Sequence, residues 1–218
     1  MNNTVKKKIM LGFSLICIMC FAAGCAFFGF DASKYIKSCL DANMHGEFEE
    51  YANITNSSVA DVEKLYNDFL DTDLSFLKQY NADAEQETRF RELFISLYKN
   101  TKYEVGEATK EDDGSYTVPV TIYKMIIFKN VMATLEDDIT SWVNSQVSSG
   151  KTPSNDEIYA YVLDYMYDKL AAEVDNPTYD EPTTTNVKVV RNSDNAYYIE
   201  QQELQSLLES LIDLENAQ

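Results

Sequence analysis

Histidine, glycine and proline are scarce in this chain of 218 residues, and the first two scarcities each exclude a class of function. His45 is the only histidine, so a site with two histidine ligands is impossible and a Ser–His–acid triad would depend on one residue. None of the seven glycines forms a G-x-G-x-x-G or P-loop motif that would cradle phosphate. We therefore expect no catalytic residue, no metal site and no cofactor. His45, directly before Gly46, is expected to end a helix.

The N-terminus combines a basic cluster with a long uncharged run. Lys6, Lys7 and Lys8 precede the 22 residues from Ile9 to Phe30, IMLGFSLICIMCFAAGCAFFGF, which contain no charge. Ammonium groups stay on the cytoplasmic side while an apolar run partitions into the bilayer. This pattern is typical of an export signal, so the rest of the chain is expected to face outward.

Four residues near the end of this run carry a resemblance. Ala22, Ala23, Gly24 and Cys25 resemble the lipobox of bacterial lipoproteins, although Ala22 stands where that motif usually has Leu. The resemblance implies cleavage between Gly24 and Cys25 and a diacylglycerol on the Cys25 thiol. An uncleaved membrane anchor is the alternative, because about 20 apolar residues suffice to span a bilayer.

This interpretation divides the chain into a signal peptide (1–24), a short tether (25–30) and one extracytoplasmic domain (31–218) anchored in the cell membrane. Two acyl chains on one cysteine make attachment stable. The tether is only a few residues long, and an extended chain spans roughly 3.4 Å per residue, so the domain must lie close to the bilayer. Phe27, Phe28 and Phe30 either enter the headgroup region or fold back onto the domain, and the sequence leaves both open.

Acidic residues outnumber basic ones 36 to 18, a net charge of −18. Loss of residues 1–24 removes three lysines and no acid. Such a chain repels polyanions, so nucleic acid is not an expected partner, and the acidity chiefly confers solubility. Cys39 is the one thiol left unmodified after cleavage and acylation, and we expect it in the core.

Apolar periodicity predicts a helical part over residues 31–100. Helices are expected at about 31–45, 48–54 and 85–100. Another helix, the third along the chain, is expected to begin at a cap formed by Ser58. Asp61 follows Ser58 by three residues, which is typical of a helix start. The third helix either continues or breaks before Leu74.

The remaining part, 101–218, alternates strands with helices. A period of two predicts a β-hairpin from Tyr103–Lys110 and Tyr116–Phe128, with Pro119 at an edge or a bulge. Helices follow at about 131–148, with Trp142 and Val147 inward, and at 155–173, where Ser154 and Glu157 form a capping box. A second hairpin joins 183–191 to 196–199, and a short leucine-rich helix completes the chain.

Runs of helices separated from runs of strands predict an α+β fold, with an antiparallel sheet of about four strands packed on helices. The element order resembles the cystatin or nuclear-transport-factor-2-like cone. The DASKYIK and GEFEEY pieces within Asp31–Tyr51 also resemble small Gram-positive lipoproteins whose domain has no assigned function.

Tyrosine is the residue type that suggests a binding site. Tyr161 and Tyr165 lie four apart on one predicted helix, so they share a face, and rings with hydroxyl tips suit sugar or peptide surfaces. Packing of this helix against the sheet is the alternative. Neighbouring acids such as Asp112 and Asp113 do not reproduce a calcium loop.

These observations favour a non-enzymatic binding or interaction domain at the cell envelope. Its partners would be the lipid bilayer, through Cys25, and an envelope protein or extracellular ligand that the sequence does not identify. Two alternatives remain: a small-molecule module with an aromatic pocket between sheet and helices, and a carboxylate-dependent hydrolase of the cell wall.

Overall fold

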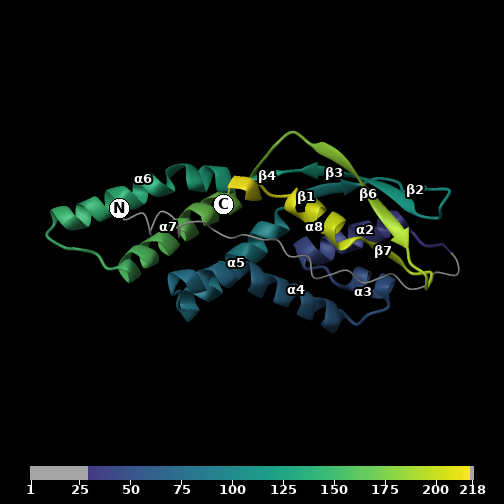
Figure 1. Cartoon of the computed structure of the whole chain (residues 1–218), viewed down its shortest axis with the longest axis horizontal. Helices are drawn as coiled ribbons and strands as arrows, with labels where there is room; N and C mark the ends of the chain where they lie inside the picture. The colour runs from purple at the N-terminus through teal and green to yellow at the C-terminus, as the bar shows by residue number, and fades with distance from the viewer. Residues whose placement is uncertain (1–28, 217–218) are drawn as a thin grey trace.

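The computed structural model describes residues 29–216, and its N-terminal part is helical (Figure 1). These helices are α2 (Ala32–Leu40), the π-helix η1 (Asp41–His45), α3 (Glu49–Thr55), α4 (Val59–Asp73), the 3₁₀-helix η2 (Leu74–Tyr80) and α5 (Ala84–Lys99). The predicted helical part is confirmed. The third helix breaks at Leu74, where α-helical geometry gives way to 3₁₀.

Short polar side chains set where these helices begin. The Asp31 carboxylate accepts the Lys34 N–H at 2.9 Å, and the Ser58 hydroxyl accepts the Asp61 N–H at 3.1 Å, as the spacing predicts. Gly46 adopts φ +69° directly after η1, a conformation that favours glycine, so His45 does end the helix.

The sheet is antiparallel. Its strands are β1 (Lys102–Val105), β2 (Thr109–Lys110), β3 (Tyr116–Tyr123), β6 (Thr183–Arg191) and β7 (Tyr197–Ile199). The order is β1-β3-β6-β7, and β2 also pairs with β3, which confirms the α+β class. The first predicted hairpin is wrong in its length, because β3 ends at Tyr123. A separate two-stranded ribbon follows, formed by β4 (Met125–Ile126) and β5 (Thr178–Tyr179).

Pro119 lies opposite a bulge and away from the sheet edge, since β3 is flanked by β1 and β6. Val105 pairs with Val120 and Thr109 with Thr117, so the three residues between β1 and β2 face only two residues of β3. The Gly106 N–H donates to the Pro119 carbonyl at 2.8 Å, and a Cβ on Gly106 would lie 2.7 Å from the proline ring. The close approach of the ring explains glycine at this position.

Two 21-residue helices, α6 (Phe128–Ser148) and α7 (Asn155–Asp175), form a helical hairpin that extends from the body at the left of Figure 1. We call residues 140–161 the hairpin tip; none of them is buried. The predicted inward position of Val147 is wrong, since this side chain is 56% exposed. The chain continues through α8 (Gln201–Glu209) and the 3₁₀-helix η3 (Leu214–Asn216).

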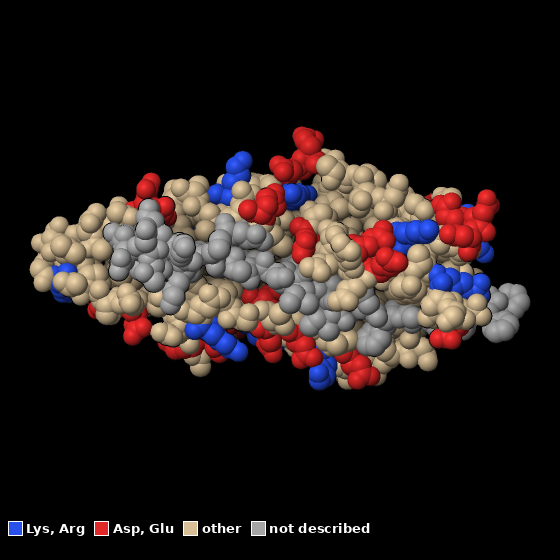
Figure 2. Space-filling view, viewed as in Figure 1, with Lys and Arg blue, Asp and Glu red and all other residues tan. Residues whose placement is uncertain are grey.

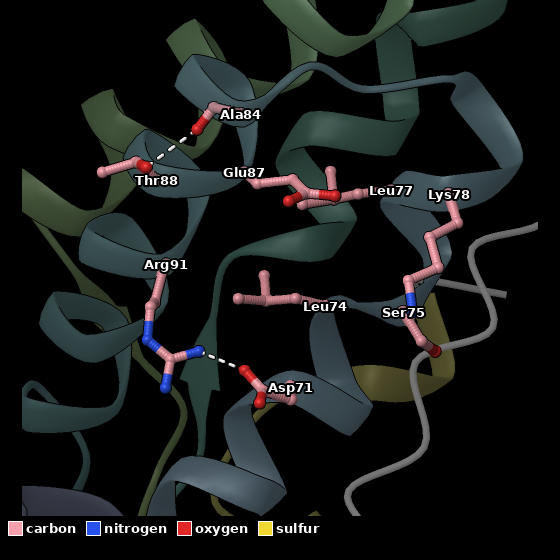
Figure 3. A pocket seen from close by; sticks show the side chains of 9 residues that line it. All are labelled: Asp71, Leu74, Ser75, Leu77, Lys78, Ala84, Glu87, Thr88 and Arg91. Atoms are coloured by element: carbon pink, nitrogen blue, oxygen red, sulfur yellow. Dashed lines mark hydrogen bonds and ion pairs between the residues drawn. The ribbon is translucent and has the colours of Figure 1, made fainter.

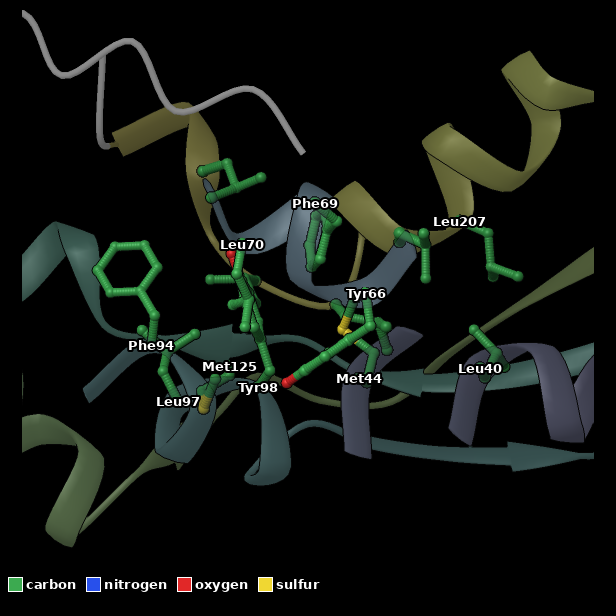
Figure 4. Packing of buried hydrophobic residues seen from close by; sticks show 14 of the residues in the cluster. Leu40, Met44, Tyr66, Phe69, Leu70, Phe94, Leu97, Tyr98, Met125 and Leu207 are labelled. Atoms are coloured by element: carbon green, nitrogen blue, oxygen red, sulfur yellow. The ribbon is translucent and has the colours of Figure 1, made fainter. Parts of the chain in front are cut away.

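The core lies between one face of the sheet and the helices. Alternate residues of β3, Val118, Val120 and Ile122, are buried, while their neighbours are more exposed. Side chains from α2, α4, α5 and α8 meet against this face of the sheet (Figure 4). Cys39 is fully buried among them, as expected. Side chains including Leu40 and Met44 fill this space, and a groove of about 210 Å³, with no aromatic side chain among the described residues that line it, opens between β6 and α8.

Candidate functional site

The start of the described chain is held against the sheet by an aromatic cluster. The Phe30 ring stacks on Tyr197 at a centroid distance of 4.2 Å and an interplanar angle of 11°. Its centroid is also 5.7 Å from those of Tyr35 and Tyr116. Of the two possibilities for Phe30, the structure therefore shows folding back onto the domain. Cys25, Phe27 and Phe28 lie outside the described residues.

Tyr161, one of the two predicted ligand-binding tyrosines, lies in a groove at the hairpin tip. Its ring stacks on Trp142 of α6, with centroids 4.6 Å apart and an angle of 14°. The groove has a volume of about 560 Å³ and is lined by Trp142, Gln146, Lys151, Thr152, Pro153, Glu157, Ala160, Tyr161 and Asp164. Pockets of this size accept small ligands. Trp142 is the chain's only tryptophan, and no pattern of residues predicted that its ring would meet Tyr161.

The charged groups of this groove are mostly engaged within the protein. The Glu157 carboxylate accepts the Ser154 N–H at 2.7 Å, and this bond, helped by nearby Lys151, lowers the pKa of Glu157. Asp164 forms an ion pair with Arg89 of α5. Burial and the charge of Asp138 raise the pKa of Tyr161, so its hydroxyl stays protonated and can donate a hydrogen bond.

Tyr165, the second predicted tyrosine, has a different position. It is 9% exposed, and its hydroxyl donates to Asp138 Oδ2 at 2.9 Å and lies 2.5 Å from the Thr134 hydroxyl. Asp138 and Thr134 belong to α6, so these bonds join the two helices of the hairpin. We assign Tyr165 to the packing that positions Tyr161.

The hairpin tip carries fewer charged residues than the rest of the chain. The tip contains three charged residues, Lys151, Asp156 and Glu157, in a chain whose net charge is −18. On the face shown in Figure 2, acidic side chains are spread over the body while the end of the hairpin is mostly uncharged. The tip therefore repels an anionic ligand less than the body does.

A second groove, of about 460 Å³, lies between η2 and α5 (Figure 3). Leu74 and Leu77 form an apolar floor, while Lys78 and Glu87 stand at the rim. Arg91 crosses it, donating to Asp71 at 2.5 Å and to Asn67 at 2.8 Å. The guanidinium is thus occupied in holding α5 to α4.

A third groove, of about 550 Å³, is acidic and lies beside η1 and α3. Asp41, Glu47, Glu49 and Glu50 are among the residues that line it. Lys37 pairs with Asp41 at 2.6 Å, and Lys34 pairs with Glu50 at 2.5 Å. His45 lies behind Asp41, where its Nε2 is 3.1 Å from the Thr101 carbonyl and its ring stacks on Tyr103. These contacts give His45 a structural role.

Two buried carboxylates lie away from the grooves and were missed by sequence reasoning. Asp213 is fully buried and accepts the backbone N–H groups of Ile127, Phe128 and Lys129 at 2.8–2.9 Å, so it caps α6 from a distant part of the chain. Asp73 accepts a hydrogen bond from Tyr98, and its other oxygen has no hydrogen-bond partner among residues 29–216. Burial raises the pKa of Asp73 to about 7.

Within residues 29–216, no group of three or more His, Cys, Asp and Glu side chains is placed to hold a metal ion. Over the same residues, no helix has both the length and the apolar character needed to cross a membrane.

Comparison with known proteins gives one structural likeness. No protein-family model and no curated protein matches the sequence. The fold is similar to the crystal structure of "a putative lipoprotein (ycdA)" from Bacillus subtilis, with a TM-score of 0.57 and 17% identity. The likeness covers 84% of this chain and 56% of that one, so this chain spans little more than half of its length. At such identity it shows a shared fold, here with a protein of a Gram-positive bacterium.

Proposed function

We propose that this chain is a lipid-anchored, non-enzymatic binding protein on the outer face of the cell membrane, which contacts an envelope ligand through the groove at its hairpin tip. The stacked pair of Trp142 and Tyr161 carries the proposal, because it places two flat aromatic rings in an open groove at an unburied end of the molecule. The basic, apolar N-terminus with its lipobox-like Cys25 supports the anchor, as does the fold shared with the Bacillus protein.

A carbohydrate chain is the ligand class that this groove fits. Aromatic faces pack against the apolar faces of sugar rings, while the Tyr161 hydroxyl and the Gln146 amide offer hydrogen bonds at the edge. Glu157 and Asp164 are held by a helix cap and an ion pair, which favours a neutral ligand.

The chain's only tryptophan reports directly on this groove. Titration of the domain with soluble glycan fragments of the cell wall should change the fluorescence of Trp142, and Tyr161→Ala should weaken binding at least tenfold. Tyr159→Ala, on the same helix but packed against Tyr80, is the matched control and should bind as the unaltered protein does. No fluorescence change with any fragment, together with an envelope protein cross-linked at the tip, would contradict the carbohydrate assignment.

The anchor has its own test. Cys25→Ala should release the protein from the membrane and abolish incorporation of a labelled fatty acid. Cys39→Ala changes the other thiol of the mature chain and should leave both unaffected. If the Cys25→Ala protein stays on the membrane at unchanged mass, the uncleaved anchor is correct instead.

A further inference from the structure

The chain enters the fold at a fixed point. Phe30 is stacked on Tyr197, and the next residue, Asp31, caps α2, so the direction of the backbone is set on both sides of this position. Gly29 is exposed, with φ +79°. An anchor at the N-terminus is therefore linked directly to the end of the sheet where β3 and β7 begin.

The distance from this point to the proposed lipid is short. Five peptide units separate Cys25 from Phe30, which at roughly 3.4 Å each allow at most about 17 Å. Tyr116 and Tyr197, which contact Phe30, must therefore stay near the bilayer surface.

The side chains at this end suit a headgroup layer. The Lys110 ammonium lies 5.7 Å from the centre of the Tyr116 ring, and the Arg191 guanidinium lies 5.7 Å from that of Tyr197. Aromatic and basic side chains together are typical of a membrane–water interface. The acids of the adjacent turn, residues 111–113, offset these cations, so the surface would rest against headgroups without binding anionic lipid strongly.

The hairpin tip lies at the opposite end of the molecule. In Figure 1 the turns after β2 and β6 are at the right, and the loop between α6 and α7 is at the far left. α6 has 21 residues, which at 1.5 Å each span about 31 Å.

From this geometry we infer that the protein stands on the bilayer, with the Phe30 end of its sheet against the lipid headgroups and the hairpin tip directed away from the membrane. The inference rests on the proposed attachment at Cys25. It explains how a tether too short to let the domain move away could still present the groove to the wall.

Energy transfer from a single tryptophan to dansyl-labelled lipid headgroups tests this orientation. The lipidated protein in vesicles, with Trp142 as donor, should show little transfer. The double variant Asp112→Trp/Trp142→Phe moves the donor to the turn beside Phe30 and should show at least fivefold more. Equal transfer in the two proteins, or more from Trp142, would overturn the orientation.

Phe30→Ala tests the fixed entry point. In the Asp112→Trp/Trp142→Phe background it should reduce transfer, whereas Phe48→Ala, which removes a partly buried ring packed against Tyr66, should not. Unchanged transfer after Phe30→Ala would contradict the role of this ring.

Mass spectrometry reports lipidation separately. If the natural lipid is missing, the proposed anchor fails, and the same measurements on chains coupled through Cys25 to maleimide lipids still decide the orientation.

Discussion

The body and the hairpin tip of this molecule differ sharply in burial. Six of the nine residues of α2 are buried, whereas α6 buries four of 21 and none beyond Ile139. Free energy of folding comes mainly from apolar area removed from water, so stability is concentrated in the body. The tip contributes little to it, and its sequence is free to serve contact with a ligand.

The largest expected effect is in the body. Phe94 is buried against Phe76 and Tyr98, so Phe94→Ala should leave a cavity and lower the free energy of unfolding by about 3–5 kcal/mol. Chemical denaturation measures this loss. Val147→Ala at the tip is the control and should be nearly neutral. Similar losses for both variants would remove the contrast between the two regions.

A smaller effect is expected where the regions join. Asp213→Ala would leave three N–H groups at the start of α6 without their acceptor, two of them on buried residues, at a cost of about 3 kcal/mol. Hydrogen exchange should accelerate first at Phe128 and Lys129. Asp213→Asn keeps one oxygen acceptor and should lose less. Unchanged exchange in Asp213→Ala would show that α6 does not depend on this cap.

The pH dependence of the body is the next contrast. The folded-state pKa of Asp73 is raised to about 7 from 3.8, so the folded protein binds this proton more tightly than the unfolded chain does. Its contribution to stability is complete below pH 3.8 and is lost as pH rises through 7, amounting to about 2 kcal/mol between pH 5 and 7. Denaturation at both pH values should show this loss. This loss of stability should be absent in Asp73→Asn. A loss that persists in that variant would come from another titratable group.

The smallest effect is expected at the groove. Trp142 is half-buried and stacks on one side only with Tyr161, so Trp142→Ala should lower stability by about 1 kcal/mol or less while removing ligand binding. Thermal unfolding and glycan binding measure the two effects separately. A loss as large as that of Phe94→Ala would show that the tip belongs to the core.

Features set by neighbouring residues could be predicted from the sequence. The Ser154–Glu157 capping box forms as expected, because both partners lie within one turn of helix. The two-stranded ribbon of β4 and β5 could not be predicted, since strands of two residues show no periodicity. The cap of α6 by Asp213 was equally hidden, because 85 residues separate Asp213 from Phe128.

The site was predictable only in part. Tyr161 was expected from its spacing of four residues from Tyr165 on one helix, but its ring partner, Trp142, was expected to point inward. The apolar stripe of α6 continues to Val147, and sequence periodicity does not show that the body ends near Ile139. Where a helix extends beyond its core, the same pattern marks exposed residues.

The proposed anchor requires that the mature protein begin at an acylated Cys25. Intact-mass measurement of the protein purified from membranes decides this. The expected mass is that of the polypeptide from Cys25 onward with diacylglycerol added to the cysteine. A polypeptide that still begins at Met1 and carries no lipid would contradict it.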